Sequence, residues 1–469
     1  MKRNLRFYFA LMFARGTALV LKLIGRKGTS MPGSWAIILC PDFIGRMPKP
    51  KKIIGITTRL REGSVVVVGT NGKTTVSNMI EDVLEDNGIE FMCNRSGTNV
   101  ATGVASTLIA NSHFFGKPKC DLAVFELDER SAPNIYPYMQ PDIVLCTNIF
   151  RDSYKRNAHA EFILDILNKE IPKGTKLVLN GDDPLCSSIK PENDRVYFGI
   201  DHLDTDKKEC DNIVNDVPAC PKCHGPLVHD IVRYHHIGRV HCEACGYRSP
   251  DIDYLATDID TKGMKMNVTV GGKKSEYPLL NSTNINIYNA LAAIATLREF
   301  GLSEEKIRNS MEKMGISETR YSEKEVNGRK YILHLAKGQN PIACSRAFEN
   351  IRNAPGKKSV VMFLDDYFDA RHTVENTAWF YDTDFEFLND PSIVQVVIAG
   401  ARHHDTYVRT LLAGVPAEKI VHMRDESDTP AAVSKEADTV FILYDVYTIR
   451  LANDIRDKMI EREKEGETK

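Results

Sequence analysis

The sequence predicts an α/β protein with a P-loop central domain, a four-cysteine segment inserted into that domain, and a C-terminal α/β domain. Three observations support this prediction. Short β-branched runs alternate with helical stretches along the 469 residues, as in a parallel sheet. A glycine-rich loop follows one of the first of these runs, and two Cys-x-x-Cys pairs interrupt the alternation.

The composition is that of a globular, cytoplasmic protein. Apolar residues make up 42% of the chain, charged residues 26%, and the formal net charge is −2. These values exclude an intrinsically disordered chain, a collagen and a polytopic membrane protein. A globally basic nucleic-acid binder is also disfavoured, and the scattered cysteines outside the inserted segment are typical of reduced core thiols.

Residues 1–60 are predicted to form a basic leader, in which Asp42 is the first acidic residue. Residues 5–24 are interrupted by Arg6, Arg15 and Lys22, so they indicate an amphipathic helix and not a membrane span. We expect this face to pack on the protein's own core; a peripheral contact with an anionic membrane is the alternative. The apolar face is expected to hold Leu5, Phe9, Met12, Phe13, Leu19, Val20 and Ile24.

The central domain is predicted over residues 61–320. Its segment Gly69-Thr70-Asn71-Gly72-Lys73-Thr74-Thr75 joins a four-valine strand to a helix, an arrangement that directs backbone N–H groups at phosphate. Lys73 would neutralise the β- and γ-phosphates and the Thr74 hydroxyl would bind Mg²⁺, so ATP and Mg²⁺ are the expected cofactors. Strands are expected at 65–68, 122–125, 143–146, 177–179 and 265–270, and helices at 74–87, 287–300 and 304–314.

Residues 207–250 are predicted to be a zinc ribbon inserted in this domain. Cys220 and Cys223 are separated by two residues, as are Cys242 and Cys245, which is the spacing of a tetrahedral zinc site. Four thiolates leave no open position for water, so a structural Zn²⁺ is expected. The histidines of this segment are expected at the surface.

The C-terminal domain is predicted over residues 321–469. Apolar runs at 360–364, 394–398 and 439–443 indicate its buried strands, and a charged helix is expected from residue 449.

The loop Gly69–Thr75 has the form found in the Mur ligase family, and further segments resemble that family in the same order. These segments are Thr147-Asn148-Ile149, Asn180-Gly181-Asp182-Asp183-Pro184 and residues 286–293. The resemblance implies a Mur-ligase-like central domain that makes amide bonds with ATP. It also implies that Glu126 binds Mg²⁺, that Asn289 lies beside the nucleotide base, and that Arg320 faces ATP.

Within that family the chain most resembles the MurT branch, in residues 28–33, in the four-cysteine insertion and in residues 379–386. This resemblance implies amidation of the D-glutamate carboxylate of lipid II through an acyl phosphate. The chain has no glutaminase signature, so ammonia is expected from a GatD-like class I glutamine amidotransferase subunit in a heterodimer. Asp369 or Asp382 is expected to complete that partner's catalytic triad.

Two alternatives stay open. One is a Mur-type ligase that adds an amino acid to a peptide or a polyglutamate without a partner. The other is a zinc-ribbon NTPase that binds nucleic acid; the ribbon has few cations, so no nucleic-acid partner is expected.

Overall fold

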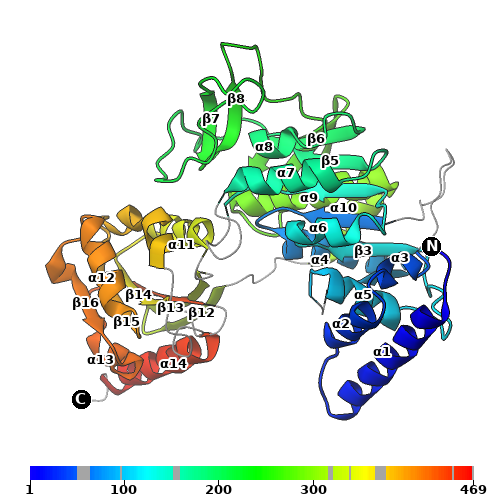
Figure 1. The fold of residues 1–469 in the computed structure, drawn as a ribbon. Coiled ribbons are helices and arrows are strands. Elements are labelled where there is room, and N and C mark those ends of the chain that lie inside the picture. The colour runs from blue at the N-terminus through cyan, green and yellow to red at the C-terminus, as the bar shows by residue number, and fades with distance from the viewer. Residues whose placement is uncertain are drawn as a thin grey trace. The chain divides into compact units, whose positions relative to one another are not determined.

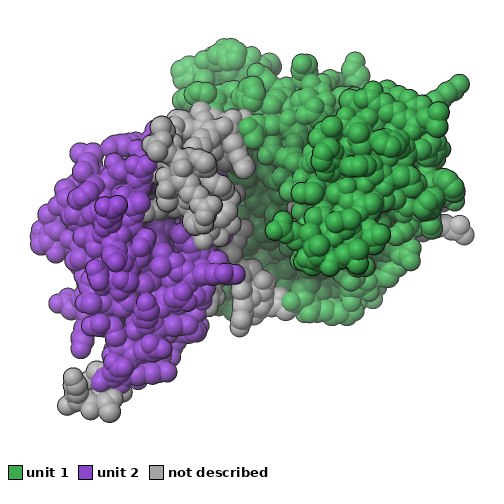
Figure 2. Space-filling model, turned by 60° about the horizontal axis from the view of Figure 1, so that its bottom comes forward, with its two compact units in different colours: residues 1–150, 159–210, 216–317 green, residues 151–158, 211–215, 318–469 purple. Residues whose placement is uncertain are grey.

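The computed structural model describes residues 1–49, 64–95, 98–151, 159–314, 321–336, 340–364, 377–445 and 448–466. Two residues that the sequence proposes for the active site, Arg320 and Asp369, lie outside these ranges. The chain forms two compact units, coloured separately in Figure 2. Unit 1 holds residues 1–150, 159–210 and 216–317, and unit 2 holds 151–158, 211–215 and 318–469.

Unit 1 is built on a nine-stranded mixed sheet with the order β11-β10-β9-β6-β5-β4-β1-β3-β2. All neighbours from β9 to β2 are parallel, whereas β10 and β11 add antiparallel strands at one edge. The predicted strands are confirmed, because the central strands are buried on both faces and so read as apolar runs. The strands are β1 (Ser64–Val68), β2 (Phe91–Cys93), β3 (Leu122–Glu126), β4 (Ile143–Cys146), β5 (Lys176–Asn180), β6 (Arg195–Ile200), β9 (Tyr254–Asp260), β10 (Lys265–Val270) and β11 (Lys273–Pro278).

Helices cover both faces of this sheet (Figure 1). The predicted helices α4 (Lys73–Asp86), α9 (Asn284–Phe300) and α10 (Glu304–Met314) are confirmed and pack against one another. The core on the opposite face is shared by the N-terminal helices and by those that follow β2, β3, β4 and β5. These helices are α1 (Leu5–Leu23), α2 (Met31–Leu39), α3 (Phe43–Arg46), α5 (Ala101–Ala110), α6 (Ala132–Ile135), α7 (Ala160–Glu170) and α8 (Pro184–Ser187).

The N-terminal helix packs on the core with a different face from the predicted one. The buried side chains of α1 are Phe7, Ala10, Leu11, Ala14 and Leu21. Of the predicted core face only Met12 packs against the core. The other six residues are exposed, with Leu5 at 89%, Phe9 at 62% and Ile24 at 60%. The prediction failed because α1 is apolar on both sides, so periodicity alone does not say which side meets the core.

The inserted segment, which follows β6 and precedes β9 in the sequence, forms a separate two-stranded antiparallel hairpin of β7 (Val228–Tyr234) and β8 (Ile237–His241). The hairpin turn is not at the surface, because His235 and His236 are buried. The His236 ring packs on Phe150 at a centroid distance of 4.5 Å. The prediction of surface histidines is therefore wrong for these two.

Unit 2 carries a six-stranded sheet with the order β12-β13-β17-β14-β15-β16, parallel except for the β12–β13 hairpin. The predicted strands and the C-terminal helix of this unit are confirmed. Two 3₁₀ turns, Thr377–Asp382 and Phe385–Leu388, bury Trp379 beside Phe380. The strands and helices are β12 (Tyr321–Val326), β13 (Arg329–Leu335), β14 (Lys358–Phe363), β15 (Ile393–Ala399), β16 (Ile420–Met423), β17 (Thr439–Tyr444), α11 (Pro341–Asn353), α12 (His403–Leu412), α13 (Thr429–Ala432) and α14 (Ile449–Gly466).

Candidate active site

The glycine-rich loop lies between the end of β1 and the start of α4, and its glycines are required by the space around it. Gly69 and Gly72 have φ values of 123° and 87°, in the left-handed region. A Cβ atom at Gly69 would lie 2.2 Å from Thr147 Oγ1, and one at Gly72 would lie 2.3 Å from Asn289 Oδ1. The loop therefore fits between the turn after β4 and helix α9, where Asn289 borders it.

The turn after β4 holds this loop by reciprocal hydrogen bonds. Asn148 Oδ1 accepts from the Asn71 N–H at 3.0 Å, and Asn148 Nδ2 donates to the Asn71 carbonyl at 3.0 Å. Thr147 Oγ1 donates to that same carbonyl at 2.7 Å. Thr70 Oγ1 accepts from the Phe150 N–H at 2.8 Å. These bonds fix the loop backbone before any ligand arrives, which lowers the cost of ordering it on binding.

Lys73 begins α4 and points back over the loop. Its Nζ donates to the Gly69 carbonyl and lies 3.1 Å from Glu129 Oε1. Burial disfavours the ammonium, but the carboxylates of Glu129 and Glu126 outweigh burial and raise the pKa of Lys73. Lys73 is thus a charged group held over the loop.

Thr74 and Glu126, the two residues expected to hold Mg²⁺, are hydrogen-bonded to each other. Thr74 Oγ1 donates to Glu126 Oε2 at 2.8 Å, and Asn99 Nδ2 donates to Glu126 Oε1 at 3.2 Å. The Glu126 backbone is paired in both directions with the Asn94 side chain. A hydroxyl and a carboxylate are oxygen ligands that Mg²⁺ prefers, so this pair fits the ion.

Glu129 is a site residue that the sequence reasoning missed. Its Oε1 accepts from the Gly69 N–H at 2.6 Å and pairs with Lys73. It therefore occupies loop donors that a phosphate would use. Its place just after β3, at the carboxyl end of a parallel strand, is the signal that could have found it.

The segment after β5 links the loop to the inserted hairpin. Asn180 Nδ2 donates to the Thr147 carbonyl at 3.0 Å, and Asp183 Oδ2 accepts from the Ile149 N–H at 2.7 Å. Asp182 Oδ2 lies 2.7 Å from Arg233 Nη1 of β7 and accepts from the Tyr288 hydroxyl of α9 at 2.7 Å. The contacts of Arg233 and Tyr288 with Asp182 were not predicted, since the family-like segment that contains Tyr288 does not indicate what its side chain meets.

The four cysteines of the insertion come together. The Sγ atoms of Cys220 and Cys245 lie 3.6 Å apart, as do those of Cys223 and Cys242, and all four lie within 4.8 Å of one another. A tetrahedral site with metal–sulfur bonds of about 2.3 Å has sulfur–sulfur edges of about 3.8 Å, close to the observed separations. Desolvation opposes the Cys242 thiolate, yet hydrogen bonds from the backbone of Cys245 and Ala244 lower its pKa to about 7. The donor set therefore fits a closed tetrahedral metal site.

Of the two aspartates expected to complete the partner's catalytic triad, Asp382 is the one that the structure describes, in unit 2. Its Oδ2 lies 2.9 Å from Arg151 Nη1, and both side chains are partly accessible. Asp384, two residues on, is fully buried and accepts from Asn212 Nδ2 and the Ile213 N–H. Of these two carboxylates, only Asp382 is open to an approaching molecule.

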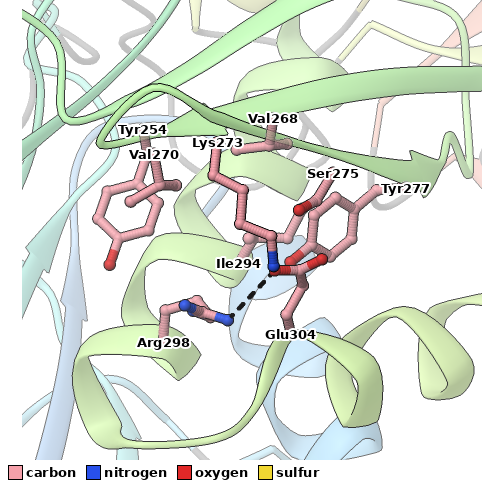
Figure 3. Close-up of a pocket in the computed structure, with 9 residues that line it drawn as sticks. All are labelled: Tyr254, Val268, Val270, Lys273, Ser275, Tyr277, Ile294, Arg298 and Glu304. Atoms are coloured by element: carbon pink, nitrogen blue, oxygen red, sulfur yellow. Dashed lines mark hydrogen bonds and ion pairs between the residues drawn. The ribbon is translucent and has the colours of Figure 1, made fainter.

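A small cavity of about 70 Å³ lies elsewhere in unit 1, between β9–β11 and α9 (Figure 3). Lys273 Nζ and Arg298 Nη1 converge there on Glu304 Oε2, at 3.1 and 3.8 Å. The strand order puts β10 and β11 at the sheet edge away from β1. This cavity is therefore not part of the nucleotide loop. It is lined by Tyr254, Val268, Val270, Lys273, Ser275, Tyr277, Ile294, Arg298 and Glu304.

Comparison with known proteins agrees with this geometry. The Mur ligase middle domain model matches residues 67–215, and the MurT ligase C-terminal model matches residues 337–449. The chain is 30% identical, over 96% of its length and 95% of the relative's, to the lipid II isoglutaminyl synthase (glutamine-hydrolyzing) subunit MurT of Staphylococcus aureus. It is 33% identical to the protein of that name from Streptococcus pneumoniae, over 89% of each chain.

Solved structures share the fold. A pseudomurein peptide ligase type C from Methanothermus fervidus matches with a TM-score of 0.61 at 20% identity, covering 86% of this chain and 79% of that one. MurF from Acinetobacter baumannii matches with a TM-score of 0.58 at 15% identity, covering 85% and 76%. These structures show the fold, and the two MurT relatives show that the chain belongs to the MurT family of Mur ligases.

Proposed function

We propose that this Mur-type ligase is the synthetase subunit of a lipid II isoglutaminyl synthase, which converts the D-glutamate carboxylate of lipid II to a carboxamide. The observation that carries the proposal is the nucleotide loop, where Lys73, Thr74 and Glu126 converge. The names of the curated relatives support amidation of lipid II over the alternative reaction, in which an amino acid is added to a peptide or a polyglutamate.

The chemistry has two steps. A carboxylate oxygen of the acceptor attacks the γ-phosphorus of ATP, and ADP leaves, which gives an acyl phosphate. Ammonia then attacks the acyl carbon, phosphate leaves, and the amine loses a proton. Lys73 would stabilise the charge that spreads over the phosphoryl oxygens. Thr74 and Glu126 would hold Mg²⁺, which supplies charge neutralisation at the β- and γ-phosphates.

Ammonia would come from a class I glutamine amidotransferase subunit. In such enzymes a cysteine attacks glutamine, and a histidine oriented by a carboxylate accepts the proton. Cys344 does not fit the role of nucleophile, because it is fully buried and burial raises the pKa of its thiol. We assign the orienting carboxylate to Asp382 or Asp369.

The direct test is to co-purify the chain with a class I glutamine amidotransferase subunit and to assay lipid II with ATP and glutamine. The expected product replaces one hydroxyl of lipid II with an amine, detected by mass spectrometry. ATP turnover that needs an amino acid and a peptide but no partner would contradict the proposal and favour the second ligase hypothesis. A salt-sensitive complex with nucleic acid and no ligation would favour the third.

We expect Asp382→Asn to lower glutamine-dependent amidation at least about a hundredfold, because the partner's histidine would lose its orienting charge. Amidation with free ammonia should stay within about twofold, since ammonia bypasses the triad. Asp390→Asn, at a partly exposed carboxylate of the same region, is the matched control. An equal loss with both nitrogen sources would instead mean that Asp382 acts only through its pair with Arg151.

We also propose that Cys220, Cys223, Cys242 and Cys245 hold a structural Zn²⁺. Cys223→Ser is expected to abolish the bound zinc, measured by metal analysis of the purified protein, and to lower the melting temperature. Cys120→Ser is the control, because that half-buried thiol belongs to no such group among the described residues. Zinc content that is unchanged in Cys223→Ser would rule out this site.

A further inference from the structure

The first helix has two apolar faces, and the core covers only one of them. Positions 5, 9 and 13 follow one another at intervals of four residues, so Leu5, Phe9 and Phe13 form a row on the outer side of α1. Val20 and Ile24 continue it, and both are more than half exposed. An apolar helix face is normally buried, and no described part of the chain covers the outer face of α1.

The outer face continues onto neighbouring segments of unit 1. Helix α1 packs against α2. The Phe13 ring meets the exposed Trp35 of α2 at a centroid distance of 5.5 Å. On the other flank, Arg15 lies over the ring of Phe114 at 5.7 Å. We call this set the leader surface: Leu5, Phe9, Phe13, Leu19, Val20, Leu23, Ile24, Met31, Trp35, Ile38, Phe114 and Phe115, all exposed.

The two segments that carry the leader surface, residues 1–41 and 111–120, hold cations and no acidic residue. The exposed cations of these two segments are Lys2, Arg3, Arg6, Lys22, Arg26, Lys27, Lys117 and Lys119. Exposed apolar side chains with cations along the same segments complement an anionic lipid surface, where rings and aliphatic chains enter the headgroup region and the cations meet the headgroups.

The leader surface is built onto the elements that carry the active site. Gly33 of α2 donates its N–H to Ser106 Oγ of α5 at 2.8 Å, and a Cβ atom there would lie 1.9 Å from the Thr102 carbonyl oxygen. Helix α5 starts two residues after Asn99, whose side chain donates to Glu126. Helix α2 of the leader surface is thus packed on α5, which begins two residues after a side chain that contacts Glu126, the expected Mg²⁺ ligand.

We propose that the leader surface docks this protein on an anionic lipid bilayer. Within the described ranges no helix combines the length and apolarity that crossing a bilayer demands, so the contact lies in the interface plane. Such a contact would bring the active site to a lipid-linked acceptor, and this part of the inference rests on the function proposed above. The binding itself needs neither ATP nor catalysis.

The test is co-sedimentation of the full chain with vesicles of phosphatidylcholine, with and without phosphatidylglycerol. Wild type is expected to pellet with the anionic vesicles only, and less so at high salt. Phe9→Asp with Ile38→Asp, or Lys22→Glu with Lys27→Glu, is expected to lower the partition coefficient by about tenfold or more. Phe162→Asp, at a half-exposed ring of α7 outside the leader surface, is the matched control and should bind as wild type.

Tryptophan fluorescence gives a second readout that does not depend on a variant. The chain has two tryptophans, of which Trp35 is exposed and Trp379 is buried in unit 2. Brominated anionic lipids should quench the emission of Trp35 and leave that of Trp379. An absence of quenching, or equal pelleting of wild type and Phe9→Asp/Ile38→Asp, would overturn the inference.

Other outcomes separate the two proposals. Wild type could instead self-associate, or bind the amidotransferase subunit, through the leader surface. If Phe9→Asp/Ile38→Asp abolishes that association and leaves vesicle binding unchanged, the leader surface is a protein interface and the inference is wrong. Amidation of detergent-dispersed lipid II without vesicle binding would refute only the docking. Vesicle binding without amidation would refute only the proposed reaction.

Discussion

Replacing Lys73 with alanine is expected to lower ATP-dependent amidation by about a thousandfold or more, with either glutamine or ammonia as the nitrogen source. The ammonium is the only cation that the described part of the loop itself supplies, and the carboxylates around it keep it charged. Without it, Glu126 and Glu129 would face the triphosphate with Mg²⁺ alone. Single-turnover formation of ADP with acceptor and saturating ATP measures the chemical step directly.

The Lys73 experiment needs two controls, because alanine also leaves Glu129 without its partner in a nearly buried position. The double change Lys73→Ala with Glu129→Gln removes that unpaired charge, and its melting curve should return toward wild type while activity stays lost. Lys274→Ala, at an exposed surface pair with Asp258, should keep full activity. A Lys73→Ala protein that folds and turns over normally would mean that another group carries the phosphoryl charge.

Much of the nucleotide site could be predicted from the sequence because its residues are consecutive. The residues from Gly69 to Thr75 that are expected to contact the nucleotide follow one another in the sequence. Four consecutive valines before them indicate a buried strand. Glu126 follows a second such strand. Local spacing is enough in these cases, because the backbone of a strand–loop–helix unit sets where each group points.

The parts that could not be predicted depend on contacts between distant segments. Arg233 and Tyr288 meet Asp182 across long stretches of sequence. The family-like segments that hold Asp182 and Tyr288 do not indicate that these side chains touch, and no motif includes Arg233. The prediction of the buried face of α1 was wrong for another reason. This helix is apolar on two sides, so the pattern predicts a helix correctly and leaves the side that meets the core undetermined.

Arg233→Met is expected to cost about 3–5 kcal/mol of the stability of unit 1, the typical penalty for breaking a buried ion pair. The Arg233 side chain is fully buried and bridges two carboxylates, Asp182 at 2.7 Å and Asp206 at 3.1 Å. It also donates to the carbonyls of Ile200 and Asp201. Methionine fills a similar volume but leaves both carboxylates and both carbonyls without this donor.

Two control variants distinguish the expected loss of stability in Arg233→Met from effects of zinc loss and of changes at the surface. Arg239 reaches the same Asp182 at 3.3 Å from a partly exposed position, so Arg239→Met should cost at most about 1 kcal/mol. Adding Asp182→Asn to Arg233→Met should restore part of the loss, because one stranded charge is removed. Chemical denaturation of all three variants, with zinc content checked in each, measures these differences.

The expected functional consequence follows from where Arg233 lies. Its Nη1 also donates to the Tyr288 hydroxyl at 2.8 Å, and the next residue of α9, Asn289, borders Gly72 of the nucleotide loop. The buried cluster thus joins the cysteine-bearing hairpin to the helix that abuts the loop. If this connection positions α9, Arg233→Met should raise the KM for ATP several-fold at a temperature where the protein is still folded. Lower stability with an unchanged KM would limit the hairpin to holding the fold together.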